Sequence, residues 1–239
     1  MNNSSLTLVV HGESGVGKSY LADSAPGPRL ILDVEGGVRF TPSKKKAWVP
    51  SGPPPELAED ESAVVTVKEL RSIQDAFAWL IRGQHAFRSV VIDSLSEVQK
   101  RSIDDIAGTE QMKLQDYGAL FRKIDSMVRA FRDLTMHETK PVDVVVFVTG
   151  TQEKGSELHP VMRPALVGKM SEQLGYSVDV MGFLSLHAEP DGTIGRRIQF
   201  AQLNGIAAKD RTGRLGVSMD DPTVPKMLET IYGKEAKVE

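Results

Sequence analysis

Residues 6–19 read LTLVVHGESGVGKS. Its first half, Leu6–Val10, is a short apolar run, and its second half is rich in glycine and ends in Gly17, Lys18 and Ser19. An apolar run that enters such a turn is typical of a buried parallel strand followed by a loop and a helix. The turn fits the pattern G-x-x-x-x-G-K-[ST], which carries meaning when a strand precedes it and a helix follows.

The glycine-rich turn, residues 12–19, is called the P-loop below and predicts a nucleotide site. Its glycines let backbone N–H groups curl around phosphate oxygens at the start of a helix. We expect the Lys18 ammonium to reach the β- and γ-phosphates of ATP and the Ser19 hydroxyl to coordinate Mg²⁺. The alternative is a glycine-rich turn without a ligand. The residues predicted to contact the nucleotide are Gly12, Glu13, Ser14, Gly15, Val16, Gly17, Lys18, Ser19 and Tyr20.

Two carboxylates follow apolar runs elsewhere in the chain. Asp93 ends the run Ser89–Asp93 (SVVID), and Glu35 lies just past the run Arg29–Asp33 (RLILD). An aspartate at the end of such a strand is expected to hold Mg²⁺, and a carboxylate beside the γ-phosphate can orient and deprotonate the attacking water. The alternatives are that Asp93 caps a helix and that Glu35 is a loop acid before a Gly-Gly turn.

The rest of the chain alternates predicted strands and helices, which implies an α/β fold with a mostly parallel sheet and helices on both faces. The other segments expected to be strands are Ala63–Val67, Val142–Thr149 and, as antiparallel additions, Val178–Leu186, Gly195–Ala201 and Leu203–Ala207. Helical spacing of apolar residues predicts helices near 70–81, 94–107, 117–134 and 169–174.

Composition and length predict a single domain over residues 1–239. The segment 41–62 is rich in proline and is expected to form a long loop or surface insertion outside the core, and 217–239 is expected to be a C-terminal tail. The chain has no cysteine, which excludes disulfides, thiolate zinc sites and cysteine nucleophiles. No apolar run is long enough for a membrane span and no signal segment is evident, so we expect a cytoplasmic protein without membrane contact.

With these motifs in place, the sequence resembles the RecA-like P-loop ATPases, among them RecA, the eukaryotic and archaeal recombinases, KaiC and the DnaB-type helicases. In that group the catalytic glutamate follows the second core strand, in a pattern like Ile31–Gly36 here. The strand 142–149 leads into Gln152, where the group carries a sensor of the γ-phosphate. The loop Glu153–Gly168 corresponds to the group's second DNA-binding loop, and Lys209-Asp210-Arg211 resembles a K-x-R finger that reaches a neighbouring subunit's ATP site.

The sequence is more closely similar to compact phage nucleotide-binding proteins, some of which are described as single-strand annealing proteins. The shared segments lie within residues 6–216 and are the P-loop, DVEGG (33–37), VVIDS (90–94), Tyr117-Gly118, PALVGK (164–169) and KDRTGRL (209–215). This resemblance implies an Mg²⁺-dependent ATPase that binds single-stranded DNA in phage recombination. It also implies a homo-oligomer with ATP sites at subunit interfaces, in which Gln152, Lys209 and Arg211 assist catalysis, and a single-strand-binding protein as a further partner.

A net charge of −3 means that any DNA contact must use local basic surfaces. Such surfaces track a phosphate backbone without reading bases, although each of them also fits an ordinary solvated face. The candidate contacts are Arg122, Lys123, Arg129, Arg132, Arg163, Lys169, Arg196, Arg197, Lys209, Arg211, Arg214 and, less strongly, Lys44–Lys46 with Trp48. Two rival functions stay open. One is an oligomeric ATPase switch or motor with a protein client, and the other is a nucleotide-binding structural module with negligible turnover.

Overall fold

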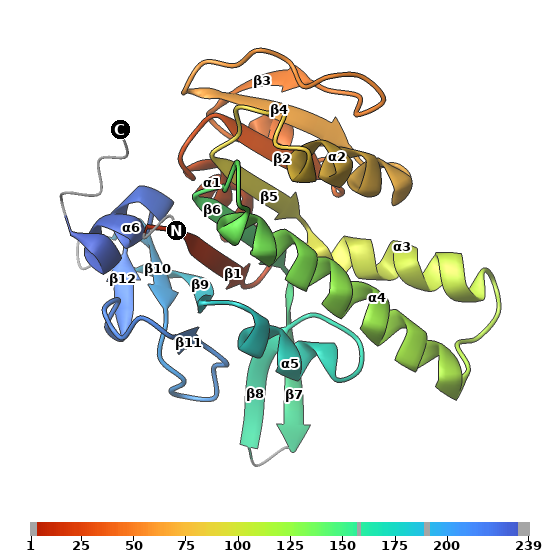
Figure 1. The fold of residues 1–239 in the computed structure, drawn as a ribbon. Helices are drawn as coiled ribbons and strands as arrows, with labels where there is room; N and C mark the ends of the chain where they lie inside the picture. The colour runs from red at the N-terminus through yellow and green to blue at the C-terminus, as the bar shows by residue number, and fades with distance from the viewer. Residues whose placement is uncertain (1–3, 157–158, 189–191, 234–239) are drawn as a thin grey trace.

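The structure is a computed structural model and describes residues 4–156, 159–188 and 192–233. A ten-stranded sheet runs through the molecule in the order β12-β10-β9-β1-β6-β5-β2-β4-β3, with β11 also paired to β9 (Figure 1). Its strands are β1 (Leu6–His11), β2 (Arg29–Asp33), β3 (Lys44–Ala47), β4 (Glu61–Thr66), β5 (Ser89–Asp93), β6 (Val144–Thr149), β9 (Val180–Ala188), β10 (Ile194–Gln199), β11 (Lys209–Asp210) and β12 (Ser218–Asp220).

The strands from β9 to β3 in this order are parallel, and β10, β11 and β12 join antiparallel. This arrangement confirms the predicted α/β fold class, with a mostly parallel central sheet, flanking helices and antiparallel C-terminal strands. The strand that leads into the P-loop, β1, is separated from the strand that ends in Asp93, β5, by β6 alone. Because parallel strands end at the same edge, the P-loop, Glu35 and Asp93 all lie at one edge of the sheet.

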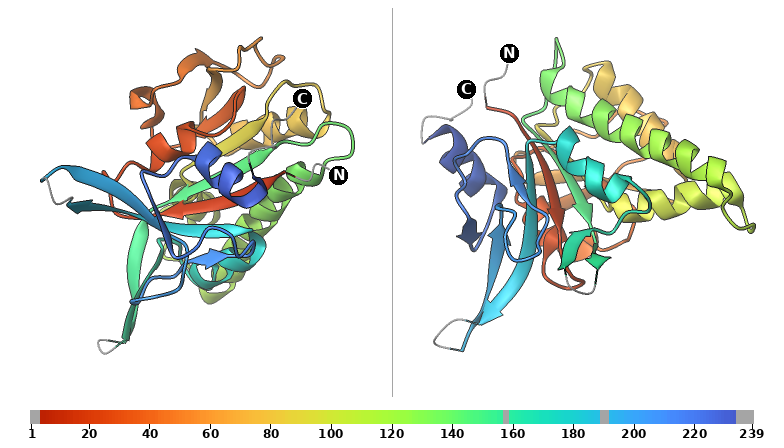
Figure 2. Two further views of the ribbon diagram at one scale, coloured as in Figure 1. Left: turned by 90° about the vertical axis from the view of Figure 1, so that its left-hand side faces the viewer. Right: turned by 90° about the horizontal axis from the view of Figure 1, so that it is seen from below.

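Helices cover both faces of the sheet (Figure 2). They are α1 (Lys18–Asp23), α2 (Arg71–Ile81), α3 (Leu95–Ala107), α4 (Leu114–Asp133), α5 (Met170–Ser177) and α6 (Val224–Tyr232), with short 3₁₀ turns at Val38–Phe40 and Leu134–Met136. The apolar sides of α2–α5 pack on one face in a core that includes Phe87 and Phe147, and α1 and α6 pack on the other around Leu8 and Val146. None of the helices in the described ranges has the length and hydrophobicity that crossing a bilayer requires.

The segment 41–62 takes part in the sheet and the core, so the expectation that it stays outside both is wrong. Lys44–Ala47 forms β3, which pairs in parallel with β4 at the edge of the sheet. Trp48 is only 5% exposed, and its ring lies 5.8 Å from that of Phe87. Lys44–Lys46 show no apolar pattern because a strand at the edge of the sheet is exposed. Charged residues at such an edge oppose pairing with the strands of other chains. A buried Trp48 offers no surface on which a base could stack.

The segment after β6 was expected to be a polar loop and is instead a hairpin of β7 (Thr151–Ser156) and β8 (His159–Pro164). This hairpin projects from the body of the molecule beyond the edge that carries the P-loop (Figure 1). Residues 157–158 of the predicted DNA-binding loop lie outside the described residues. The strand expected at 203–207 is absent, and an isolated bridge from Ile206 to Met162 stands there, because the chain turns at Asn204 and Gly205 with positive φ.

The part of the predicted tail that the structure describes, residues 217–233, is folded. It contains β12 and α6, and Val224 and Met227 of this helix are fully buried against the sheet. Thr223 caps the helix by accepting a hydrogen bond from the Lys226 N–H, and Pro225 occupies its first turn. The spacing of the apolar residues in this short helix was not recognised in the sequence.

Candidate nucleotide site

The P-loop connects the C-terminal end of β1 to α1, which begins at Lys18. Gly17 adopts a positive φ of 96°, and a Cβ atom at Gly12 would lie 2.3 Å from the Leu184 carbonyl oxygen. Both positions therefore need glycine. The Lys18 Nζ donates hydrogen bonds to the carbonyl oxygens of Gly12 at 3.0 Å and Glu13 at 2.7 Å, which holds the ammonium over the loop.

The Lys18 ammonium lies within electrostatic reach of the two carboxylates predicted from the sequence. Partial burial lowers the pKa of Lys18, and the charges of Glu35, Asp93 and Glu13 act in the opposite direction. The ammonium therefore lies close enough to both Glu35 and Asp93 for their charges to act on it. Side chains from the P-loop, the loop after β2 and the end of β5 meet here, as the sequence predicts for Lys18, Glu35 and Asp93.

Asp93 is 2% exposed, and burial raises its pKa to about 6. The Ser19 hydroxyl donates a hydrogen bond to this carboxylate, while its Oδ2 atom has no hydrogen-bond partner among the described residues. A buried carboxylate oxygen without a partner is costly unless another group satisfies it. Oxygen ligands are those that Mg²⁺ prefers, so the Ser19 and Asp93 pair fits this ion.

Glu35 is held in place by Ser94, the residue that caps α3. The Ser94 hydroxyl donates a short hydrogen bond to Glu35 Oε1 and accepts one from the Glu97 N–H at 3.3 Å, so it caps α3 at the same time. The backbone N–H groups of Val34 and Glu35 donate to the Asp93 carbonyl oxygen at 2.7 and 3.3 Å. These contacts fix the Glu35 loop against the end of β5.

Arg101 of α3 also fixes this loop. Its guanidinium donates to the Val34 carbonyl oxygen at 3.1 Å and to the Lys68 carbonyl oxygen at 2.6 Å. The loop that carries Glu35 is therefore contacted by the N-cap of α3, Ser94, and again about two turns into the helix, by Arg101. Sequence reasoning missed this contact because no local pattern pairs a helix residue with a loop 67 positions earlier.

The Gln152 side chain lies at the same sheet edge and is bound within its own hairpin. Its Nε2 donates to the carbonyl oxygens of Pro164 at 3.1 Å and Leu166 at 2.8 Å. Helix α3 reaches the same segment, because Ser96 Oγ donates to Ala165 O at 3.0 Å and Gln99 Oε1 accepts from the Val167 N–H at 2.6 Å. The hairpin and its following loop are thus hydrogen-bonded to the helix that begins beside Asp93.

His11, the last residue of β1, is a further connection that the sequence did not reveal. It is fully buried, and burial lowers its pKa to about 4, so the ring is neutral at pH 7. One ring nitrogen lies 3.3 Å from Thr151 Oγ1 and the other 2.7 Å from the Ala207 carbonyl oxygen. His11 therefore connects the start of the P-loop to the start of the hairpin.

Lys209 and Arg211 lie away from this site. Lys209 pairs with Met181 of β9. The backbone N–H of Arg211 donates a hydrogen bond to the carbonyl oxygen of Asp179. The side chain of Asp179 in turn accepts a hydrogen bond from the Thr7 N–H at the start of β1. Arg211 is therefore level with Thr7, and at about 3.3 Å per residue the P-loop begins roughly 17 Å further along β1.

Both finger residues are bound within their own chain. Lys209 Nζ donates to the carbonyl oxygens of Gly175 at 2.6 Å and Val178 at 2.9 Å, which satisfies the C-terminal end of α5. Arg211 forms an ion pair with Asp179 at 3.0 Å. The structure does not bring either residue to the P-loop of the same chain.

The predicted DNA-contacting cations divide into two groups. Many are paired with acids of their own chain: Lys44 with Asp60, Lys46 with Glu61, Lys123 with Asp105, Arg129 with Asp125, Arg132 with Asp133 and Arg197 with Asp220. Arg214 donates to the Ile231 carbonyl oxygen, and Arg196 contacts the P-loop. In contrast, Arg122 and Lys169 form no ion pair with any residue that the structure describes.

Arg122 and Lys169 face a groove of about 390 Å³ between the start of α4 and the loop before α5. Tyr117 and Phe121 line the same groove, and Tyr117 is 44% exposed. This groove adjoins the hairpin, because Lys154 of β7 donates to Gly168 O at 3.3 Å and to Ser171 Oγ at 2.9 Å. Unpaired cations beside an exposed aromatic ring form the combination that binds single-stranded nucleic acid.

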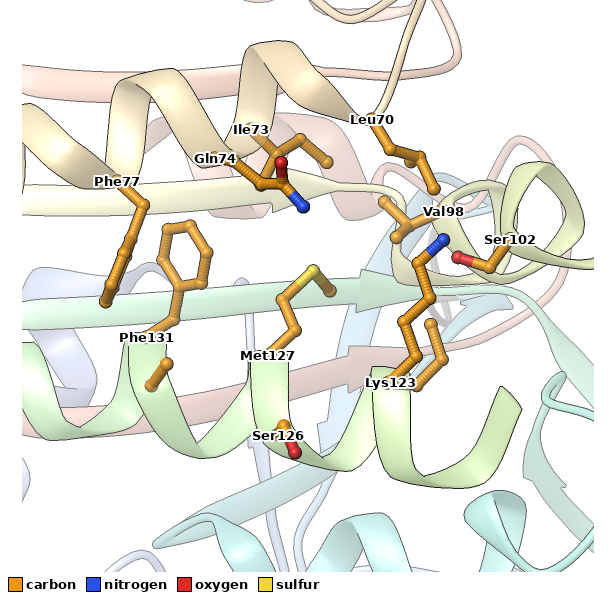
Figure 3. A pocket seen from close by; sticks show the side chains of 12 residues that line it. Leu70, Ile73, Gln74, Phe77, Val98, Ser102, Lys123, Ser126, Met127 and Phe131 are labelled. Atoms are coloured by element: carbon orange, nitrogen blue, oxygen red, sulfur yellow. The ribbon is translucent and has the colours of Figure 1, made fainter. Parts of the chain in front are cut away.

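A separate apolar pocket of about 290 Å³ lies between α2, α3 and α4 (Figure 3). Phe77 and Phe131 stand at one end of it, and Ser102 and Lys123 at the other. The buried Ser102 hydroxyl has no hydrogen-bond partner among the described residues. None of the residues predicted to bind the nucleotide or metal lines this pocket, so its position does not alter the assignment of the site.

Three comparisons with known proteins bear on this geometry. No curated protein sequence matches the chain. Among solved structures, a prototypical ATPase from the type III secretion system of pathogenic bacteria matches 75% of this chain at 12% identity and a TM-score of 0.48, and this chain spans only 52% of that protein. The flagellar accessory protein FlaH from Methanocaldococcus jannaschii matches 81% of this chain and 76% of its own at 11% identity and a TM-score of 0.36. The sequence pattern of one family, described as AAA domain (AAA_24), matches residues 4–212. The chain therefore belongs to the AAA domain family.

Proposed function

We propose that this protein is an Mg²⁺-dependent ATPase that acts on single-stranded DNA. The observation that carries the ATPase part is the convergence of Lys18, Ser19, Asp93 and Glu35 at one edge of the sheet, with Ser94 holding the Glu35 carboxylate. When bound at Ser19 and Asp93, Mg²⁺ would neutralise charge on the phosphates. The P-loop N–H groups and Lys18 would bind the phosphate oxygens.

Glu35 is the proposed general base. Its side chain is exposed at the mouth of the site, and one of its carboxylate oxygens is fixed by Ser94. The other oxygen can accept a proton from a water molecule in line with the γ-phosphate. A base fixed in this way loses little entropy when the reactants align, so Ser94 acts as a positioning residue.

The groove beside the hairpin supports the DNA part of the proposal. Arg122 and Lys169 would contact backbone phosphates, and Tyr117 would stack on a base. Helix α3 supports coupling between the two sites, because Ser94 contacts Glu35 at its start while Ser96 and Gln99 contact the segment that borders the groove. Gln152, bound to the same segment, would sense the γ-phosphate.

The finer parts of the proposal rest on the resemblance to compact phage proteins. They are a role in phage recombination by annealing or strand pairing, a homo-oligomer whose ATP sites lie at subunit interfaces, and a single-strand-binding protein as partner. The distance of Lys209 and Arg211 from their own P-loop favours action on a neighbouring subunit. Such a role implies the cytoplasm of a bacterial host.

Two assays test the proposal. Glu35→Gln should lower ATP turnover by about 10²- to 10⁴-fold while ATP binding stays within twofold, since a general base contributes that much to the rate. Exposed Glu56→Gln is the matched control and should keep full turnover. Substantial turnover in Glu35→Gln would remove Glu35 from its role, and no turnover in the wild-type protein would favour the structural module.

The DNA part is tested by anisotropy of a labelled single-stranded oligonucleotide, with and without Mg²⁺-ATP, at two salt concentrations. Binding should weaken with salt, because phosphate contacts release counterions, and should change with nucleotide. Tyr117→Ala should weaken binding by about tenfold through loss of base stacking. Arg129→Ala, on the same helix but paired with Asp125, should not. Absence of binding in every nucleotide state would favour the protein-client alternative.

A further inference from the structure

Arg196 of β10 lies against the P-loop, although its charge alone suggested a DNA contact. Its Nε donates to the Val16 carbonyl oxygen at 3.2 Å, and its guanidinium lies 5.2 Å from the centre of the Tyr20 ring. A Cβ atom on Gly17 would stand 2.5 Å from the Arg196 Nε. The glycine thus permits the close approach of this arginine, which comes from a strand 180 positions away from Val16.

The order of the strands tells which part of a nucleotide this arginine faces. Within the sheet the strands lie side by side in the order β10-β9-β1-β6-β5. The P-loop follows the central strand β1, Asp93 ends β5 on one side of it, and Arg196 lies in β10 on the other. A triphosphate is a linear chain, and the P-loop holds its middle. If its γ-phosphate lies toward Asp93 and Glu35, its nucleoside extends to the opposite side, where Tyr20 and Arg196 stand.

We propose that Tyr20 and Arg196 form the platform on which the nucleobase of the bound nucleoside triphosphate stacks. This inference rests on the proposed ATP-binding function and adds the site of base recognition to it. Tyr20 is 49% exposed although its ring contacts Arg196, so the pair offers a flat surface to solvent. A planar guanidinium and a phenol ring both stack on a heteroaromatic base, whereas a phosphate contact needs charge alone.

The neighbouring Arg197 provides a matched control. Successive residues of a strand point to opposite faces of the sheet, so Arg197 faces away from Arg196. Its Nε lies 2.5 Å from Asp220 Oδ1, in an ion pair on that face. The two arginines carry the same charge and are neighbours in one strand. They differ in whether they contact the P-loop.

The test compares the binding of ATP with that of inorganic tripolyphosphate, which has the phosphates and no base. Dissociation constants are measured by calorimetry with Mg²⁺ for the wild type, Arg196→Ala, Tyr20→Ala and Arg197→Ala. We expect Arg196→Ala and Tyr20→Ala each to weaken ATP binding about tenfold and to leave tripolyphosphate binding within twofold. Arg197→Ala should change neither, and Tyr20→Phe should bind ATP as the wild type does.

Equal weakening of both ligands in Arg196→Ala would overturn the proposal, because it would mean that Arg196 acts on phosphates. Unchanged ATP binding in Arg196→Ala and Tyr20→Ala would overturn it as well. The Lys18→Ala variant distinguishes a failure of this proposal from a failure of the proposed nucleotide site. If the wild type binds neither ligand, or if Lys18→Ala binds both as well as the wild type, the nucleotide site itself is refuted. Unfolding midpoints of all variants verify that they are folded.

Discussion

Predicted catalytic residues lie at both ends of the central sheet, but the groups that surround them differ. At the end where β1, β2 and β5 finish, Lys18, Asp93 and Glu35 come from separate segments and lie close enough for their charges to act on one another. At the other end, Lys209 and Arg211 come from one short segment and are bound to groups of their own chain. The first end carries the P-loop and the two carboxylates of the proposed ATP site, and the second end carries the two cations proposed to act on a neighbouring subunit.

The contacts at the second end indicate which of the two finger residues could more easily reach a neighbouring subunit. The ion pair of Arg211 with Asp179 leaves the arginine side chain 53% exposed, and such pairs contribute only about 0–1 kcal/mol. A neighbouring active site could therefore draw Arg211 away at little cost. Lys209 is only partly exposed and donates to two backbone carbonyl oxygens, whereas Arg211 is exposed and donates to one, that of Tyr176, at 3.2 Å. Of the two finger residues, Arg211 is the better candidate for action on a neighbouring subunit.

The largest effect of a single substitution is expected at the nucleotide end. Asp93→Asn should lower Mg²⁺-dependent ATP turnover by at least about 100-fold, because it removes the charge that holds the metal over the phosphates. Exposed Asp104→Asn on α3 is the control and should keep its activity. Steady-state turnover over a range of Mg²⁺ concentrations measures both. Equal turnover in the two variants would contradict the assignment of Asp93.

A smaller effect is expected from the residue that holds the general base. Ser94→Ala should lower kcat about tenfold, since it removes one hydrogen bond to a charged group, and should leave the KM for ATP nearly unchanged. Ser94→Thr keeps both the hydrogen-bond donor and the helix cap and should recover most of the turnover. A rise in KM without a fall in kcat would mean that Ser94 supports binding instead of positioning Glu35.

The acidity of Asp93 predicts a pH dependence at the nucleotide end. Burial raises its pKa to about 6, so the carboxylate is charged at pH 7.5 and mostly protonated at pH 5. A metal ion must displace this proton, so the apparent Mg²⁺ affinity of the protein should fall about tenfold per pH unit below pH 6. Calorimetric titration with Mg²⁺ and a nucleotide measures this slope, which should be lost in Asp93→Asn. A pH-independent affinity in the wild type would contradict the prediction.

The smallest effect concerns stability. Burial lowers the pKa of His11 from 6.5 to about 4, so the unfolded chain gains a proton at a higher pH than the folded protein does. The contribution of neutral His11 to stability is therefore present above pH 6.5 and is lost as the pH falls toward 4. It should cost about 2 kcal/mol of unfolding free energy between pH 7.5 and 5. Urea unfolding at both pH values should show a smaller loss of unfolding free energy in His11→Asn than in the wild type. This variant retains His85, whose pKa burial also lowers to about 4.

The sequence predicted the nucleotide end well because buried parallel strands are continuous apolar runs. The runs at β1, β2, β5 and β6 fixed the sheet, and the residues just after them were bound to meet at one edge. It predicted β3 poorly, since a lysine-rich edge strand has no apolar pattern. The contact between Ser94 and Glu35 depends on the pairing of Asp33 with Asp93 in neighbouring strands, which no local pattern reveals.

Charge was the least informative signal in the sequence. Arg196 and Arg197 were equivalent as basic residues, yet one contacts the P-loop and the other pairs with Asp220. Two of the four cations of α4, Lys123 and Arg129, are paired with acids that lie on another helix or four positions away. Counting charges along the chain cannot separate these cases, because the partner of a charge is set by the fold.

The most direct test of the difference between the two ends is ATP turnover in a mixture of two inactive variants. Lys18→Ala removes the lysine proposed to bind the phosphates, and Arg211→Ala removes the arginine proposed to act on a neighbouring subunit. In randomly mixed oligomers, about a quarter of the interfaces would pair an intact P-loop with an intact Arg211. We expect mixing to restore turnover to roughly that fraction of the wild-type value. Turnover that stays at the sum of the two separate variants, in oligomers shown to contain both, would contradict it.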